Sequence, residues 1–287
     1  MNLDAALVAA RFVHLLSLLL VAGALAFPHY ASPARPAGPA SGGRLLSSGA
    51  LLALLAALAW FAATLGGMAG DPAAAFDPQV LQEAFAGTQF APIWAGRVAL
   101  LAALVPLTLS RPRAKLTAGV AALALGSIAL TGHSRAETGA AGAMHVVADA
   151  MHLLTAGLWL GALPCLASLL RPGHDPLEAA QAVRRFSAVA SAAVALLVIT
   201  GAVQTWLLAG SPLALPGSDW GRLLLIKLAL VAGMVALAAH NRRRVTPRIA
   251  GGDGGALLRR NALAELGLGA GVVAVVAWLG TLAPTAH

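Results

Sequence analysis

Three ionisable residues near the middle of the chain are spaced so that one helix would present them together. His145, Asp149 and His152 stand at positions i, i+4 and i+7, which lie on one face of an α-helix. Imidazole nitrogens with a nearby carboxylate can hold a transition metal, and the carboxylate can orient an imidazole. Met144 and Met151 flank this face, and thioether sulfur favours Cu(I). The pattern predicts a copper site and leaves open whether it takes Cu(I) or Cu(II).

Other histidines are candidates to complete this site. His14 lies about ten residues into the first apolar segment, and His133 and His287 end the fourth and eighth segments. Ionisable groups inside a membrane span are costly unless they are paired or face a cavity, so each is a functional candidate. Each also has an ordinary explanation, because a single histidine near a helix end usually lies at the surface and methionine at helical spacing usually fills packing gaps. The candidate metal ligands are His14, His133, Met144, His145, Asp149, Met151, His152 and His287.

Membrane-spanning helices must position these residues. Of the 287 residues, 59% are hydrophobic and 10% are charged, whereas about a quarter of a soluble domain is charged. Eight apolar segments approach the roughly 20 residues that cross a bilayer, and in lipid each must be a helix because its backbone polar groups need internal partners. A single cysteine excludes a disulfide framework or a CxxC metal site. We expect an all-α polytopic membrane protein with spans at about 4–27, 45–66, 92–110, 115–132, 145–169, 186–209, 220–241 and 260–282.

The basic residues predict the orientation of these helices. The formal net charge is +8, but the basic residues fall in short clusters between apolar segments, which is how topology is encoded and not a nucleic-acid surface. Alternate connections (28–44, 111–115, 170–185 and 242–260) hold 14 of the 19 basic residues, whereas 67–91, 133–144 and 210–219 hold only Arg135. By the positive-inside rule the first set faces the cytoplasm. Both termini are therefore expected outside.

The two halves of the chain resemble each other. The stretch from His14 to Leu25 aligns without gaps on the stretch from His152 to Leu163, and Trp94-Ala-Gly-Arg97 parallels Trp220-Gly-Arg222. We therefore expect two parallel four-helix repeats, residues 1–132 and 133–287. Transporters are often built from such repeats, with the site near their interface. Convergent low complexity is the alternative explanation.

The chain resembles the copper resistance protein D (CopD/PcoD) family. The resemblance covers essentially the whole chain and is carried by these motifs: Gly132-His-Ser, the run from His145 to Leu163, Arg185-Phe-Ser, Thr200-Gly-Ala-Val-Gln-Thr-Trp206, Gly221-Arg-Leu-Leu-Leu-Ile-Lys227, Asn241-Arg-Arg-Arg244 and Leu279-Gly-Thr-Leu-Ala-Pro284. It implies an eight-helix protein of the bacterial inner membrane that takes copper from the periplasm inward. It also implies a periplasmic copper-binding partner of the CopC type, which would be a separate chain here.

One layer of basic residues fits copper transport poorly. Arg11, Arg97, Arg222 and Lys227 are predicted near the level of Asp149 and would repel a cation unless they point elsewhere or are paired. The same layer fits a membrane electron-transfer protein in which His14 and His152 are axial ligands of a b-type haem. A third possibility is a structural subunit whose histidines form a polar packing network. No nucleotide-binding fingerprint is present, and we expect a transport protein and not an enzyme.

Overall fold

The protein is an all-helical bundle. The computed structural model describes residues 3–31, 40–110, 114–131, 139–209, 212–249 and 253–283, and these contain helices and no strand. The elements of the first half are α1 (Leu3–Tyr30), α2 (Ala40–Ala69), η1 (Pro72–Phe76), α3 (Pro78–Gly87), α4 (Phe90–Leu107), α5 (Ala114–Gly126) and η3 (Ser127–Thr131). Those of the second half are α6 (Gly139–Leu160), α7 (Leu163–Leu169), α8 (Pro176–Ala209), η5 (Pro212–Gly217), α9 (Asp219–His240), η6 (Asn241–Val245), α10 (Thr246–Ile249) and α11 (Gly255–Leu279).

Each of the eight predicted spans is confirmed as a helix long and apolar enough to cross a membrane. Within the described residues these are Asp4–Tyr30, Gly42–Ala69, Phe90–Leu107, Ala114–Thr131, Gly139–Leu169, Pro176–Leu207, Asp219–Ile249 and Gly255–Leu279. The fifth is broken after Leu160, because Pro164 has no N–H to continue the ladder of α6 and lies instead in the first turn of α7.

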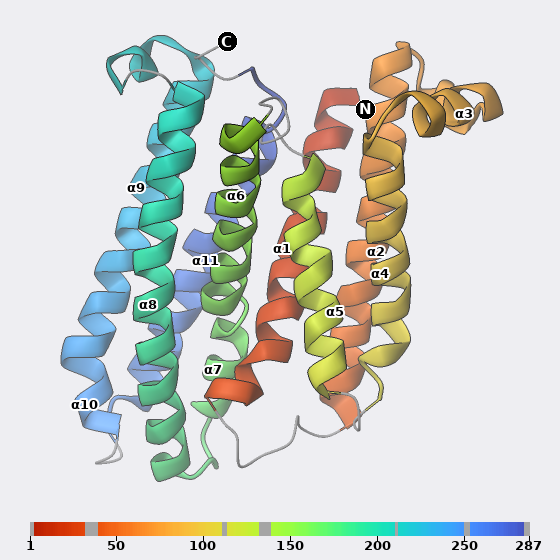
Figure 1. Cartoon of the computed structure of the whole chain (residues 1–287). Helices are drawn as coiled ribbons and strands as arrows, with labels where there is room; N and C mark the ends of the chain where they lie inside the picture. Colours follow the sequence, from red (N-terminus) through yellow and green to blue (C-terminus); the bar gives the residue numbers. More distant parts are fainter. Residues whose placement is uncertain are drawn as a thin grey trace.

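The spans form two groups that lie side by side (Figure 1). Helices α1, α2, α4 and α5 pack together on one side, while α6, α8, α9 and α11 form the other. The groups meet where α1 contacts α6 and α11 and where α5 contacts α6.

Close contact between α1 and α6 depends on glycine. A Cβ at Gly23 would collide with the backbone of Gly157 and Gly161, and a Cβ at Gly161 would collide with that of Leu19 and Gly23. Small residues are used in this way where membrane helices approach closely. Gly23 and Gly161 also occupy equivalent positions in the alignment of the two halves.

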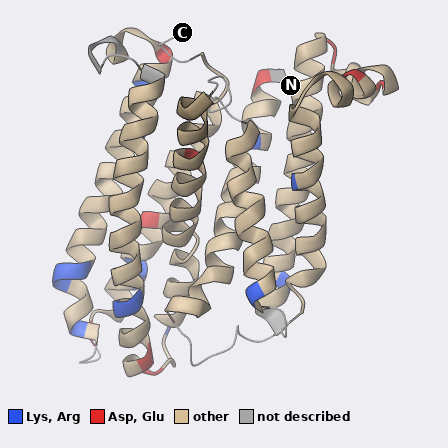
Figure 2. Ribbon diagram, viewed as in Figure 1, with Lys and Arg blue, Asp and Glu red and all other residues tan. Residues whose placement is uncertain are grey.

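The two ends of the bundle differ in charge. Lysines and arginines concentrate at the end where α7 and α10 lie (Figure 2), which we call the basic end. Its described basic residues include Arg44, Lys115, Arg171, Arg184, Arg185, Arg242, Arg243, Arg244 and Arg248. The start of α1 and the end of α11 lie at the opposite end, together with α3 (Figure 1), and we call it the terminal end.

The connection between the second and third spans is partly helical. Helix α3 begins at Pro78, and its start is capped by the Asp77 side chain, which accepts from the Gln79 N–H at 2.8 Å. Helix α3 and the short η1 bury Ala75 and Ala84 against Leu65 and Ala91 of α2 and α4. These elements therefore cover the first group of helices.

Candidate functional site

Helix α6 presents the predicted face toward the interior of the bundle. His145 is buried, with 2% of its surface exposed, and Asp149 and His152 are half-buried. The Nδ1 atom of His145 is buried and has no hydrogen-bond partner in the described part of the chain. A buried ring nitrogen of this kind requires an explanation, and a ligand is one.

His145 and Asp149 line one cavity of about 190 Å³, which we call the terminal-end cavity. The other polar side chains of its lining come from both groups of helices, with Arg11 from α1, Thr131 from η3, Gln204 and Thr205 from α8, and Trp220 and Lys227 from α9. Trp60 closes it on the α2 side. The cavity is therefore a small polar chamber at the junction of the two groups.

The carboxylate of Asp149 has neutral and charged neighbours in this chamber. The Gln204 side-chain amide donates a hydrogen bond to Asp149 Oδ1 at 3.4 Å. Lys227 lines the same chamber and acts electrostatically on Asp149. Gln204 was not singled out as a site residue from the sequence, although it stands four residues after Thr200 in the Thr200–Trp206 motif, which puts the two polar groups on one face of α8.

Arg11 is held away from Asp149. Its Nε donates to the Ala277 carbonyl at 3.0 Å, and its guanidinium stacks over the Trp60 ring at 4.6 Å. Gly280 leaves room for this guanidinium, since a Cβ there would collide with it. Within the described part of the chain no ion pair joins Arg11 to Asp149, so α11 and Trp60 fix the arginine.

Two of the four basic residues that argued against a cation site lie elsewhere. Arg97 is fully buried and ties α4 to η3, donating to the Ser127 carbonyl at 2.6 Å and to Thr131 Oγ1 at 2.8 Å. Arg222 is exposed and donates to the Pro216 carbonyl and to Asp219. Of these four basic residues, only Arg11 and Lys227 line the chamber.

His152 lies two turns along α6 and faces the next cavity. This middle cavity of about 500 Å³ is lined largely by apolar side chains, with Lys227 and Thr205 shared with the terminal-end cavity. His152 Nδ1 is 2.9 Å from Thr200 Oγ1, and that hydroxyl donates to the Leu196 carbonyl at 2.7 Å. Since the hydroxyl proton is used, Nδ1–H is the donor and Nε2 carries the lone pair that a metal needs.

His14 is enclosed by aromatic rings of the first group. It is fully buried, its Nδ1–H donates to the Ala53 carbonyl at 2.8 Å, and its ring lies 5.6 Å from that of Trp60. His14 lines none of the cavities described in the structure, although Trp60 links it to the terminal-end cavity.

Two further predicted ligands are not brought to this chamber, and two are not described. Met144 and Met151 are on the exposed side of α6. His133 and His287 lie outside the described residues. Over the ranges that the structure describes, no three His, Cys, Asp or Glu side chains are grouped as a ready-made metal site.

Fold and site together define a multi-pass helical membrane protein with a buried histidine–carboxylate chamber. Two family models match it, the N-terminal domain of copper resistance protein D-like proteins over residues 1–143 and copper resistance protein D over residues 180–279. The chain belongs to the copper resistance protein D family.

Two relatives illustrate the family. "Copper resistance protein D" of Pseudomonas syringae pv. tomato is 34% identical over 143 residues, which are 45% of this chain and 46% of that protein. "Inner membrane protein YebZ" of Escherichia coli (strain K12) is 30% identical over 285 residues, which are 96% of this chain and 98% of that protein. No solved structure matches the chain.

Proposed function

We propose that this protein binds a copper ion in the terminal-end cavity and moves it across the bacterial inner membrane toward the cytoplasm. The observation that carries the proposal is the unpartnered Nδ1 of His145, buried beside the Asp149 carboxylate in a chamber large enough for an ion. Imidazole is a common copper ligand. The family to which the chain belongs supplies the metal, and we treat the protein as a transporter and not an enzyme.

The charge distribution supports an orientation for this transport. The basic end is placed in the cytoplasm by the positive-inside rule, so the termini and the terminal-end cavity face the periplasm. A potential of 100 mV, negative inside, then favours inward movement of one positive charge by about 2.3 kcal/mol. A separate periplasmic CopC-like protein is the proposed donor of copper to this side.

The proposed two-repeat organisation places the chamber at the repeat interface. Helices α1 and α6 begin residues 1–132 and 133–287 in equivalent ways, and their aligned residues Gly23 and Gly161 contact each other. Equivalent residues meet in this way on the axis of a twofold arrangement. The cavity lining, drawn from α1, α2, α6, α8, α9 and α11, fits such an interface.

The donors of the chamber suit both copper oxidation states. Its described lining offers imidazole and carboxylate, while the exposed Met144 and Met151 would have to be reached by rotation of α6. His152, two turns along, is proposed as the next ligand on the path. His14, His133 and His287 stay as additional candidates from the sequence.

The haem alternative receives no support. It requires His14 and His152 to face one cofactor-sized space, and none of the cavities described is lined by both. Both matching family models and the Pseudomonas syringae relative are named for copper resistance.

Copper uptake by proteoliposomes tests the proposal. Wild-type protein should take up copper under an inside-negative potential, and His145→Ala and Asp149→Asn should abolish uptake. His240→Ala, which changes an exposed histidine at the other end of α9, is the control and should retain it. Uptake by His145→Ala at the wild-type rate would overturn the proposed site.

A further inference from the structure

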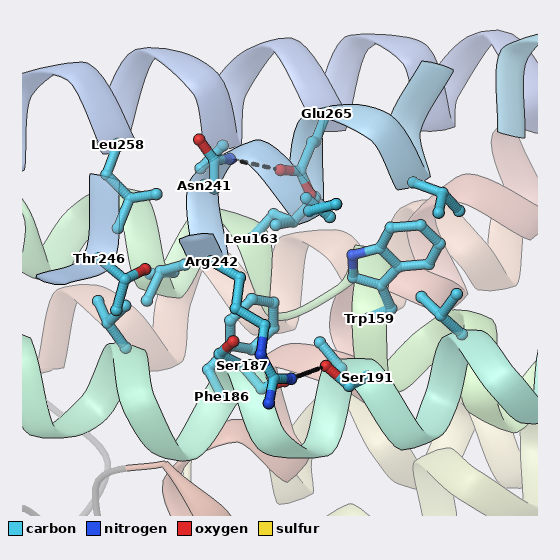
Figure 3. A pocket seen from close by; sticks show the side chains of 18 of the residues that line it. Trp159, Leu163, Phe186, Ser187, Ser191, Asn241, Arg242, Thr246, Leu258 and Glu265 are labelled. Carbon is cyan, nitrogen blue, oxygen red and sulfur yellow. Dashed lines mark hydrogen bonds between the residues drawn. The ribbon is translucent and has the colours of Figure 1, made fainter. Parts of the chain in front are cut away.

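A third cavity, of about 310 Å³, lies at the basic end between α6, α8, α9, η6 and α11 (Figure 3). It contains Glu265, which is ten residues inside the last span and only 3% exposed. We call it the basic-end cavity. A buried carboxylate within a membrane span is expensive and marks a functional position.

A neutral donor holds this carboxylate in place. The Asn241 side-chain amide donates to Glu265 Oε1 at 2.7 Å, as Figure 3 shows, and Trp159 lines the same cavity. Asn261 in turn donates to Asn241 Oδ1 at 2.6 Å. Asn241 opens the π-helical turn η6, a distortion frequent at functional sites.

Among the described residues, the arginines that face this cavity leave the carboxylate without a cationic partner. Arg242 donates to the Ser187 carbonyl at 3.2 Å and to the Ser191 hydroxyl, so its guanidinium is directed toward α8 (Figure 3). Arg243 is exposed at the same mouth. The other residues that line this cavity, from α6, α7, α8, α10 and α11, include no titratable side chain besides Glu265 itself.

The donor set determines which cation fits. Asn241 Oδ1 is already used by Asn261, so the cluster offers the two oxygens of Glu265 and few others. A hard metal cation needs about six oxygens. Copper prefers nitrogen or sulfur ligands, which the cluster does not present. A proton needs one oxygen only.

The three cavities lie next to one another along the second group of helices. The terminal-end and middle cavities share Gly201, Thr205, Leu224 and Lys227. The middle and basic-end cavities share Trp159, Val194 and Val235. The largely apolar middle cavity therefore lies between the His145 and Asp149 chamber and the cavity of Glu265.

We propose that Glu265 is a proton-binding site whose proton is exchanged for the transported copper ion. A copper ion that passes through the basic-end cavity without a ligand of its own there brings positive charge near the carboxylate and favours release of its proton, and a bound proton correspondingly disfavours passage of the metal. Because the two positive charges repel each other, the copper ion and the proton occupy this cavity in turn and not together. The exchange rests on the proposed copper transport, whereas proton binding by Glu265 does not.

Two measurements on full-length protein test this proposal. In proteoliposomes that enclose a pH-sensitive dye, copper uptake by the wild type should be accompanied by proton movement in the opposite direction. Glu265→Gln, which keeps the shape but cannot titrate, should lose this proton movement, and Glu265→Asp should restore part of it. Glu178→Gln, at the exposed start of α8, is the matched control and should behave as wild type.

Infrared difference spectroscopy across a pH titration supplies the second readout. The carbonyl band of a protonated carboxylic acid should titrate in the wild type and be missing in Glu265→Gln, with an unchanged melting temperature to show that the variant folds. A band that persists in the variant, or copper uptake with undiminished proton movement in Glu265→Gln, would overturn the proposal. If the wild type takes up no copper, the transport function fails, and the infrared band alone then decides whether Glu265 binds a proton.

Discussion

At the scale of single residues, the terminal-end cavity combines groups that attract and repel a metal cation. His145 and Asp149 offer a free ring nitrogen and a carboxylate, whereas Lys227 and Arg11 bring positive charge to the same chamber. Arg11 is fixed by Ala277 and Trp60, but Lys227 lines two adjacent cavities and acts electrostatically on Asp149. Copper binding at this site must therefore displace or tolerate the Lys227 ammonium.

Removal of that charge should tighten copper binding. Lys227→Met keeps the apolar stem and removes the repulsion, and we expect the copper dissociation constant to fall by about tenfold, equivalent to about 1.4 kcal/mol. Titration of the purified protein with a competing chelator measures it. Arg222→Met, at an exposed position, should leave the dissociation constant unchanged. A larger dissociation constant for Lys227→Met would show instead that the lysine supports the site.

The Thr200 hydroxyl should matter through His152. Thr200→Val keeps the side-chain shape and removes the acceptor that fixes the His152 ring, and loss of such an orienting partner commonly weakens metal binding by about 10- to 100-fold. The same chelator titration checks this, with Thr88→Val of α3 as control. An unchanged constant would remove His152 from the proposed path.

At the scale of elements, the contact between α1 and α6 sets the position of the predicted face. Both helices approach through glycine, and their backbones leave no space for a side chain. Because α6 carries His145 and Asp149 while α1 carries Arg11, this contact also sets the distance between the groups of the chamber.

Substitution of the crossing glycine should destabilise the bundle. Gly161→Ala forces a Cβ against the backbone of α1, and overpacking of this kind costs about 1–3 kcal/mol. Thermal unfolding in detergent measures the resulting drop in melting temperature. Gly119→Ala in α5, where a Cβ meets open space, should not lower it. Equal melting temperatures for the two variants would contradict the packing described for α1 and α6.

The sequence was sufficient to predict the membrane spans and the helical face of His145, Asp149 and His152. It was insufficient to predict which residues of other helices lie opposite that face. Helical periodicity predicts that His145, Asp149 and His152 align. Met144 and Met151 each stand one position before a histidine of this face, which is about 100° around the helix. They therefore point outward when the histidines point inward. The neighbours Gln204 and Arg11 come from helices remote in sequence. In the sequence, Asn241 stands beside three arginines at a helix end, as a residue at the membrane surface would. Its hydrogen bond to Glu265, 24 positions away, is visible only in the structure.

At the scale of the whole molecule, the separation of charge between the two ends gives the account its direction. Basic residues gather at one end, and the start of α1 and the end of α11 lie at the other. With the basic end in the cytoplasm, the three neighbouring cavities lie in order from the periplasmic side to Glu265.

Single-cysteine labelling in intact cells tests this orientation. In a Cys165→Ala background, Phe76→Cys at the terminal end should react with a membrane-impermeant maleimide, because this position is 78% exposed. Leu177→Cys, 62% exposed at the start of α8, should react only after the cells are permeabilised. The reverse pattern would place the His145 chamber on the cytoplasmic side and reverse the proposed direction of transport.

The claim on which the account depends is that copper binds in the chamber of His145 and Asp149. Elemental analysis for copper and iron on purified, detergent-solubilised protein after copper loading tests it most directly. The account predicts about one copper ion per chain, as a single site requires, no iron, and loss of the copper in His145→Ala. Iron in place of copper, or copper retained in full by His145→Ala, would contradict it.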